Sequence, residues 1–366
     1  MARFALIGWG WRAEFFARAA AELAPRLELT GVVTRSAERA NTVTNNWHVP
    51  VYASVDDLLS SPRPDFVVVS VPPAVAVGHL DTLAGANLPA LCETPPAPDL
   101  EGLAHVCELA RRGARIQIAE QYPFQPLHAA RLALSDAGVI GNVSMTGVSF
   151  SHGYHAFSVL RHHLSVGGEA ATIRATSGAA PVEVGNTRAG PRQQIAMTEE
   201  VRTLGIIEYP GRLGLYDFET NQHRSYVRFL HVTVRGSHGE ISDDELRVVR
   251  GLDETMTIPL RRVTAGQDGD LSGHQLMGIT GLDGWAWRNP FPGARLADDE
   301  IAVAQCLVKM AEHAEGGPEF YGAADGAQDH YLYLKLQQAA GSGDVVRTTV
   351  QPWADQMLVN ARAEGA

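Results

Sequence analysis

Lysine is nearly absent from this chain of 366 residues, where only Lys309 and Lys335 occur among 30 lysine and arginine residues. Any chemistry that needs a lysine must therefore use one of two residues, both far along the chain. Aspartate and glutamate number 41, which leaves a net charge of −11. Nucleic acids and anionic membranes bind to positively charged surfaces, so neither is an expected partner.

Cysteine is also scarce, since Cys92, Cys107 and Cys306 form an odd, scattered set without a CxxC pair or a cysteine–histidine cluster. This usage is typical of buried free thiols in a reducing compartment and indicates no zinc site. Long hydrophobic runs are missing as well. The apolar stretch Phe4–Ile7 is too short for a signal sequence or a membrane span, so we expect a cytoplasmic protein without a metal.

The length predicts two domains or one very large one, and the secondary-structure pattern changes near residue 125. Before that point, short apolar runs alternate with helical segments. The β-branched run Asp65–Val71 is typical of a strand buried on both faces. This alternation predicts an α/β fold with a doubly wound parallel sheet over residues 1–124. Residues 125–366 predict an α+β domain with a large open, mostly antiparallel sheet.

Some segments of the second half carry specific expectations. Residues Met256–Val263 predict a single strand, whereas Ala179–Arg192 are rich in glycine, proline and alanine and predict a surface loop. The spacing of apolar residues predicts helices over His155–Leu164, Asp298–Ala314 and Ala323–Ala339.

The first predicted strand runs into a glycine-rich turn. The sequence Gly8-Trp9-Gly10-Trp11-Arg12-Ala13 matches the pattern G-x-G-x-x-G/A between a strand and a helix. Gly8 permits the tight turn, Gly10 lets a pyrophosphate approach the backbone, and Ala13 keeps helix and strand close. The N–H groups that begin the helix attract phosphates. The turn therefore predicts dinucleotide binding in preference to a tight turn without a ligand.

The end of the second predicted strand bears on the choice between NAD and NADP. An acidic residue here would bond the ribose 2′-hydroxyl of NAD, but the chain reads Thr34-Arg35-Ser36. Arg35 and Ser36 supply donors for a 2′-phosphate, and the fork of N–H groups on arginine suits it. NADP is favoured, while NAD stays compatible if Arg35 merely stacks on the adenine.

Further motifs accompany this turn. They are Val69-Ser70-Val71-Pro72 and Cys92-Glu93-Thr94-Pro95 at strand ends, Phe124-Gln125-Pro126 at the domain junction, Gly153-Tyr154-His155 before a helix, and Tyr331–Thr348 near the end. With them, nearly the whole chain resembles the Gfo/Idh/MocA oxidoreductases. The resemblance implies an NAD(P)-binding Rossmann domain, hydride transfer on sugars, cyclitols or related small molecules, and a homodimer or homotetramer formed through the second sheet. The residues it places along the cofactor are Ser70, Val71, Pro72, Glu93 and Thr94.

Two features depart from the family pattern. Thr94 stands where the family has a lysine near the nicotinamide and the substrate, and serines replace both acids of its D-x-G-x-H-x-x-D motif at Ser151 and Ser158. The histidine of that motif is retained as His155. We expect His155 to act as acid or base, because its ordinary pKa of about 6.5 lies near working pH. Thr94 can offer only a neutral hydroxyl.

Other polar residues surround the expected cleft. Glu93 ends a parallel strand, where it either bonds a ribose or substrate hydroxyl or caps the next helix. Glu120 and Tyr122 follow the sixth strand and are candidates to replace the missing proton-transfer groups. Gln121 stands where relatives carry an asparagine near the nicotinamide. Tyr154 is a further catalytic candidate, and the candidates for substrate contact are His152, Tyr122, Trp287 and His330. The aromatic stretch that contains Trp287 is also typical of an interface or core segment.

Three functions remain open from the sequence. The first is an NAD(P)-dependent oxidoreductase that acts on a carbohydrate-like substrate, with His155 handling the proton. The second is an enzyme whose tightly held NAD(H) is recycled within each turnover, as in glycoside cleavage or epimerisation. The third is a non-catalytic dinucleotide-binding sensor that has lost its proton-transfer set.

Overall fold

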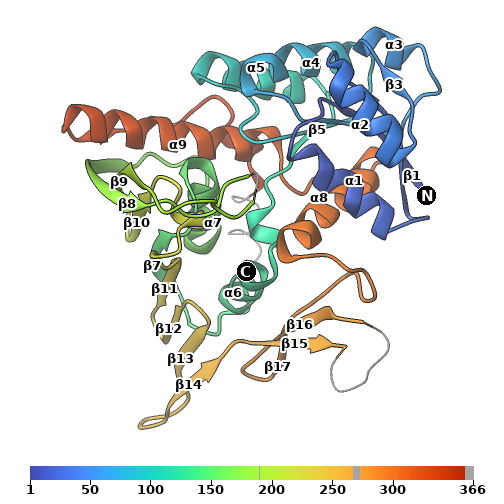
Figure 1. The fold of residues 1–366 in the computed structure, drawn as a ribbon. Helices are drawn as coiled ribbons and strands as arrows, with labels where there is room; N and C mark the ends of the chain where they lie inside the picture. Colours follow the sequence, from blue (N-terminus) through green and yellow to red (C-terminus); the bar gives the residue numbers. More distant parts are fainter. Residues whose placement is uncertain (189, 267–272, 359–366) are drawn as a thin grey trace.

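The computed structural model describes residues 1–188, 190–266 and 273–358. Its first third, drawn in blue to teal in Figure 1, contains a parallel sheet of six strands in the order β3-β2-β1-β4-β5-β6. The strands are β1 (Ala2–Ile7), β2 (Leu27–Val33), β3 (Val51–Tyr52), β4 (Phe66–Val69), β5 (Ala90–Cys92) and β6 (Ile116–Ile118). The helices between them are α1 (Ala13–Glu22), α2 (Ala37–Trp47), α3 (Val55–Leu59), α4 (Pro73–Gly85) and α5 (Leu100–Arg111). The predicted Rossmann domain is confirmed.

Strand β4 shows why this sheet is buried on both sides. All four of its residues are buried, and they alternate between two hydrophobic cores. Val67 and Val69 face the core that α4 and α5 cover, whereas Phe66 and Val68 face the core that includes α1. A run of β-branched and aromatic residues without alternation is what a strand in this position requires.

The second half is built on a mixed sheet of nine strands in the order β14-β13-β12-β11-β7-β10-β9-β8-β18. These strands are β7 (Val143–Ser149), β8 (Thr172–Glu183), β9 (Met197–Tyr209), β10 (Arg212–Glu219), β11 (His231–Gly236), β12 (Gly239–Ser242), β13 (Glu245–Val249), β14 (Thr255–Pro259) and β18 (Val346–Arg347). Only the pair β7–β10 is parallel among the pairs described. The expectation of a large, mostly antiparallel sheet is confirmed.

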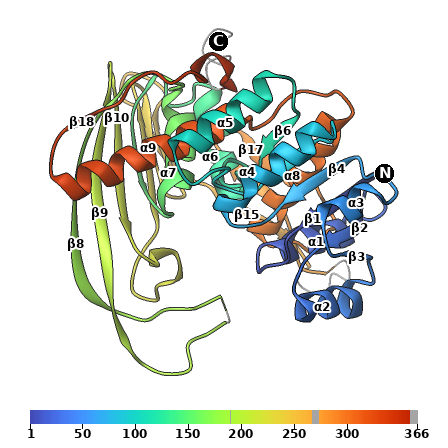
Figure 2. The same ribbon diagram turned by 90° about the horizontal axis from the view of Figure 1, so that it is seen from above.

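Two long helices cover one face of the nine-stranded sheet. They are α7 (Gly153–Leu164) and α9 (Ala323–Ser342), and they lie between this sheet and the Rossmann domain (Figure 2). The chain enters the second half through a short 3₁₀ helix, η1 (Tyr122–Phe124), and α6 (Pro126–Asp136). The 3₁₀ helices η2 (Gln222–Arg224) and η3 (Ala354–Gln356) complete the set of described helices with α8.

Helix α8 (Asp298–Ala314) returns to the Rossmann domain. It packs against α1, and Ile301 and Leu307 join the core that contains Phe16. Ion pairs such as Arg18–Glu300 also link the two helices. The division into residues 1–124 and 125–366 stays a prediction, because this late helix completes the cover of the early sheet.

The prediction of one strand over Met256–Val263 was wrong. Residues Met256–Val263 form parts of two strands, because Leu260 is buried and its N–H donates to the Asp244 carbonyl, which turns the chain into a second, three-stranded sheet. That sheet comprises β15 (Arg261–Ala265), β16 (Gln275–Gly281) and β17 (Gly284–Arg288).

The loop predicted over 179–192 begins too early, since β8 continues to Glu183. Beyond Ile173, β8 pairs only with β9 among the described strands, so the missing N–H of Pro181 is tolerated at this edge.

No helix among the described residues is long and apolar enough to cross a membrane. Cys92, Cys107 and Cys306 are all buried free thiols, as expected.

Candidate active site

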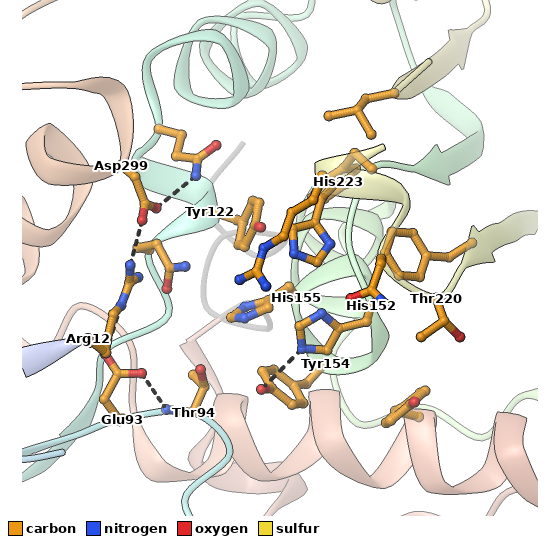
Figure 3. Close-up of a pocket in the computed structure, with 18 of the residues that line it drawn as sticks. Arg12, Glu93, Thr94, Tyr122, His152, Tyr154, His155, Thr220, His223 and Asp299 are labelled. Atoms are coloured by element: carbon orange, nitrogen blue, oxygen red, sulfur yellow. Dashed lines mark hydrogen bonds and ion pairs between the residues drawn. The ribbon is translucent and has the colours of Figure 1, made fainter. Parts of the chain in front are cut away.

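A cleft of about 1930 Å³ runs between the Rossmann domain and the nine-stranded sheet. Figure 3 shows residues of both domains that line it. The predicted site residues that line the cleft are Gly8, Trp9, Gly10, Trp11, Arg12, Ser70, Val71, Pro72, Glu93, Thr94, Gln121, Tyr122, His152, Tyr154 and His155. Those that lie outside its lining are Ala13, Thr34, Arg35, Ser36, Glu120, Trp287 and His330.

The glycine turn has the shape that its sequence predicts. Gly8 has φ +94°, and a Cβ there would lie 2.3 Å from the Ser70 carbonyl oxygen, so only glycine fits. A Cβ on Gly10 would meet no protein atom within 4 Å. Trp9 is buried and packs edge-on against Trp47, so its indole does not fill the turn. The backbone beside Gly10 is therefore open to the cleft.

Arg12 links the turn to two other elements. Its guanidinium forms ion pairs with Glu93, at 3.3 Å, and with Asp299 of α8. Gln125 Nε2 donates to the other Asp299 oxygen at 3.0 Å. Burial raises the pKa of Glu93, and the Arg12 charge opposes that rise. The Arg12 side chain is thus committed to carboxylates, which leaves the phosphate-facing part of the turn to its backbone.

The segment that follows β2 carries the basic residues Arg35 and Arg39. Ser36 caps α2, because its Oγ accepts the Arg39 N–H at 3.3 Å. Arg35 is exposed and Thr34 is half-buried. Arg39 lines the cleft but was not predicted from the sequence. Its position in the first turn of α2, close to Arg35, could have identified it as a further candidate for cofactor binding.

His155 forms a pair with Glu120 below the surface of the cleft. His155 Nδ1 lies 2.7 Å from Glu120 Oε2, and the Tyr122 N–H donates to Glu120 Oε1 at 3.1 Å. Both side chains are buried, although only His155 reaches the cleft. Burial raises the pKa of Glu120 and lowers the pKa of His155, so each shift favours a neutral group. The arrangement can hold one proton and pass it along a single hydrogen bond.

Aromatic rings fix the orientation of this histidine. The ring centroids of Tyr122 and Tyr154 lie 4.6 and 4.4 Å from that of His155. His152 Nε2 lies 3.4 Å from the Tyr154 hydroxyl, and the side chain of Thr94 also interacts with Tyr154. Burial raises the pKa of Tyr122 to about 12 and that of Tyr154 above its ordinary value. Both phenols therefore stay protonated and can donate hydrogen bonds.

Two predicted substrate contacts lie elsewhere. Trp287 is on β17 and packs against both hydrophobic cores, outside the cleft lining. His330 is on α9, where its Nε2 lies 3.3 Å from the Pro98 carbonyl oxygen and its ring lies 5.8 Å from that of Tyr154. His330 therefore stands behind Tyr154 instead of facing the cleft.

Three residues on the far wall of the cleft, which is the side formed by the second domain, were not predicted from the sequence. Arg188 lies between β8 and β9, while His223 and Arg224 lie on η2. These irregular segments have no periodicity that could have marked them. Within the described ranges, no group of three or more histidine, cysteine, aspartate or glutamate residues could hold a metal ion.

Comparison with known proteins agrees with this geometry. Residues 2–120 match the model of an oxidoreductase family with an NAD-binding Rossmann fold, GFO_IDH_MocA. No protein with a curated function has a matching sequence.

Solved structures are similar over almost the full chain. An oxidoreductase from Agrobacterium radiobacter, in complex with NAD⁺, L-tartaric acid and magnesium, is 17% identical, with a TM-score of 0.67 and coverage of 94% of this chain and 98% of that one. A levoglucosan dehydrogenase bound to NADH and levoglucosan is 15% identical (TM-score 0.68, coverage 94% and 99%). A putative myo-inositol dehydrogenase from Sinorhizobium meliloti 1021 is 16% identical (TM-score 0.66, coverage 96% and 100%). The match over residues 2–120 identifies the amino-terminal domain as an NAD-binding Rossmann fold of the Gfo/Idh/MocA oxidoreductase type, and the whole chain shares the two-domain fold of these structures.

Proposed function

We propose that the protein transfers a hydride between a nicotinamide cofactor and a carbohydrate, cyclitol or related small molecule, with His155 as acid or base. The observation that carries this proposal is the contact of 2.7 Å between His155 Nδ1 and the buried Glu120 carboxyl group. Without its proton, the pair can accept one from a substrate hydroxyl at His155 Nε2. With its proton, the pair can donate one to a carbonyl oxygen.

The residues present fit a nicotinamide dinucleotide. The turn at Gly8 and Gly10 leaves open backbone for a pyrophosphate, and Gln121 Oε1 is buried without a hydrogen-bond partner in the described parts of the chain. That oxygen is an acceptor for an N–H group of a bound molecule. When bound, the nicotinamide supplies or accepts the hydride, which is the chemistry of the cofactor itself.

NADP is the favoured form of the cofactor. No acidic residue stands at Thr34–Ser36 to bond a 2′-hydroxyl, while Arg35 is exposed and Arg39 lines the cleft. Two guanidinium groups at this position favour a 2′-phosphate. Comparison of the dissociation constants of NADP⁺ and NAD⁺ by calorimetry tests this preference, and R39Q is expected to reduce it.

A second candidate function is a reaction in which the cofactor is oxidised and reduced again within one turnover, as in glycoside cleavage or epimerisation. Its support is Thr94, a neutral residue that interacts with Tyr154 at the position where relatives carry a lysine. This alternative predicts nucleotide that copurifies with the protein and product without a net change in nicotinamide absorbance. A non-catalytic sensor would not need the buried Glu120–His155 pair.

The test of the main proposal begins with release and identification of any copurified nucleotide. Sugars, cyclitols and their oxidised forms are then screened with NAD and NADP while nicotinamide absorbance is followed. H155N is expected to lower turnover by at least ~10²-fold, the lower range for general acid–base catalysis. H105N is the matched control, because His105 lies on the surface of α5, paired with Asp81. Turnover of H155N close to that of the wild type contradicts the proposal.

A homodimer or homotetramer formed through the nine-stranded sheet is also part of this proposal. Helices α7 and α9 cover its inner face (Figure 2). On the outer face, Ile206 pairs with Leu215 and Leu213 pairs with Met145, so apolar side chains gather there next to the exposed Leu204. An apolar patch of this kind on a sheet marks a protein–protein contact.

A further inference from the structure

Two arginines on the far wall of the cleft have no carboxylate partner among the residues that the structure describes. Neither Arg188 nor Arg224 forms an ion pair in the parts of the chain described above. The guanidinium carbons of both lie over the Trp11 ring, 5.4 and 5.9 Å from its centroid. Trp11 follows Gly10 in the glycine turn, so the two cations reach across the cleft from the second domain to the first.

We propose that Arg188 and Arg224 bind an anionic oxygen group of the substrate, so that the enzyme acts on a sugar acid or a sugar phosphate instead of a neutral sugar. This inference rests on the proposed function and specifies its substrate class. Arginine offers a planar fork of donors that matches carboxylate and phosphoryl oxygens.

The charges of the cleft support an anionic ligand. Three of the acidic residues that line the cleft already have arginine partners. Glu93 and Asp299 form ion pairs with Arg12, and Asp298 forms one with Arg262. The two free guanidinium groups therefore dominate the far wall, although the whole chain carries a net charge of −11. A wall that carries one sign of charge attracts ligands of the other sign.

The positive charge is directed toward the acid–base residue. The ring of His152 lies 5.2 Å from that of His155 and 6.2 Å from that of His223, which connects η2 to the catalytic pair (Figure 3). Burial lowers the pKa of His152 to about 3 and that of His223 to about 4, and the charges of Arg188 and Arg224 contribute to both shifts. Both histidines thus stay neutral beside the two cations, and an anion bound there lies on the side of the cleft that carries His152 and His223.

The two arginines also disfavour each other in the absence of an anion. The pKa of Arg224 is lowered, first by partial burial and then by the charge of Arg188. An anionic group between them would relieve this repulsion and accept N–H donors from both. The cofactor pyrophosphate is the other source of such oxygens near Trp11, and the experiment separates the two.

The experiment measures binding to the protein loaded with its nicotinamide cofactor, by calorimetry. D-Gluconate is compared with D-glucitol, and D-glucose 6-phosphate with D-glucose, because each pair differs by one anionic group. We expect at least one anion to bind roughly tenfold or more tightly than its neutral partner, as for charge-assisted hydrogen bonds. R224Q should remove most of that preference, R188Q part of it, and R224K should retain part of it.

Controls separate this inference from the proposed function. R111Q, on the surface of α5 and paired with Glu108, should keep the preference. Binding of the probes is measured without turnover, so its outcome does not depend on proton transfer by His155. Equal affinity for charged and neutral probes, or no binding of either anion at millimolar concentration, overturns the inference. It is also overturned if R224Q weakens ADP-ribose binding to the cofactor-free protein as strongly as it weakens anion binding, because the arginines then serve the pyrophosphate.

Discussion

Two carboxylates in the cleft region, the half-buried Glu93 and the buried Glu120, show how partners determine the chemistry of one residue type. Glu93 faces the guanidinium of Arg12, whose charge counteracts the effect of burial on its pKa. Glu120 faces the neutral ring of His155 and a backbone N–H, so burial raises its pKa to about 8. Glu93 is therefore suited to fixed structure, and Glu120 to holding a proton near neutral pH.

The raised pKa of Glu120 predicts the pH dependence of turnover. The proton that Glu120 holds at pH 6 is lost as the pH rises through about 8. Oxidation of an alcohol needs the pair without that proton, so kcat/KM for oxidation should rise through this range, and that for carbonyl reduction should fall.

E120Q should abolish this change of kcat/KM with pH and lower turnover by up to ~10²-fold, because a glutamine cannot exchange a proton with His155 Nδ1. The pH profiles of kcat/KM for wild type, E120Q and the surface control E108Q measure this. An unchanged limb in E120Q would assign the titration to another group.

Helix α7 carries His155 and is anchored to α9 by a buried ionic network. Arg161 follows His155 on the same helix. Its side chain is completely buried and forms ion pairs with Asp325 and Asp329 of α9. The Tyr321 hydroxyl adds a hydrogen bond to Ser158 at 2.8 Å. This network determines where α7 lies and therefore where its histidine meets Glu120.

Removal of the cation tests that anchor. R161L leaves two buried carboxylates without their partner, which is expected to destabilise the fold by about 3–5 kcal/mol. R111Q, on an exposed helix face, should change stability by less than about 1 kcal/mol. Chemical denaturation followed by circular dichroism measures both. A small effect of R161L would mean that the carboxylates take up protons at little cost.

The whole molecule combines one sheet covered on both faces with a second sheet that is covered on one. The Rossmann sheet is enclosed by its own helices and by α8, which joins it from the end of the chain. The nine-stranded sheet has α7 and α9 on its inner face and apolar residues on the outer one. A second copy of the chain is the partner that we propose for the outer face.

L204D places a charge on that outer face and should shift the protein toward the monomer. Multi-angle light scattering during size-exclusion chromatography measures the mass. L252D is the matched control, since Leu252 is fully exposed between β13 and β14, away from this patch. If both variants keep the mass of the wild type, the sheet face is not the interface.

The sequence by itself determined the Rossmann domain, its glycine turn and the residues at the strand ends. Local patterns are sufficient there, because apolar runs, turn glycines and the common edge of parallel strands follow from short stretches of chain. His155 and Glu120 were each recognisable as candidates for the same reason.

Only the tertiary structure decided that Glu120 and His155 meet, since they lie 35 positions apart on different elements. It also decided that α8 covers the Rossmann sheet, that β8 extends into a segment predicted as loop, and that Trp287 lies outside the cleft. The positions of Arg188 and Arg224 were also decided only by the tertiary structure. Irregular segments have no periodic pattern of apolar residues, so their positions depend on contacts with distant parts of the chain.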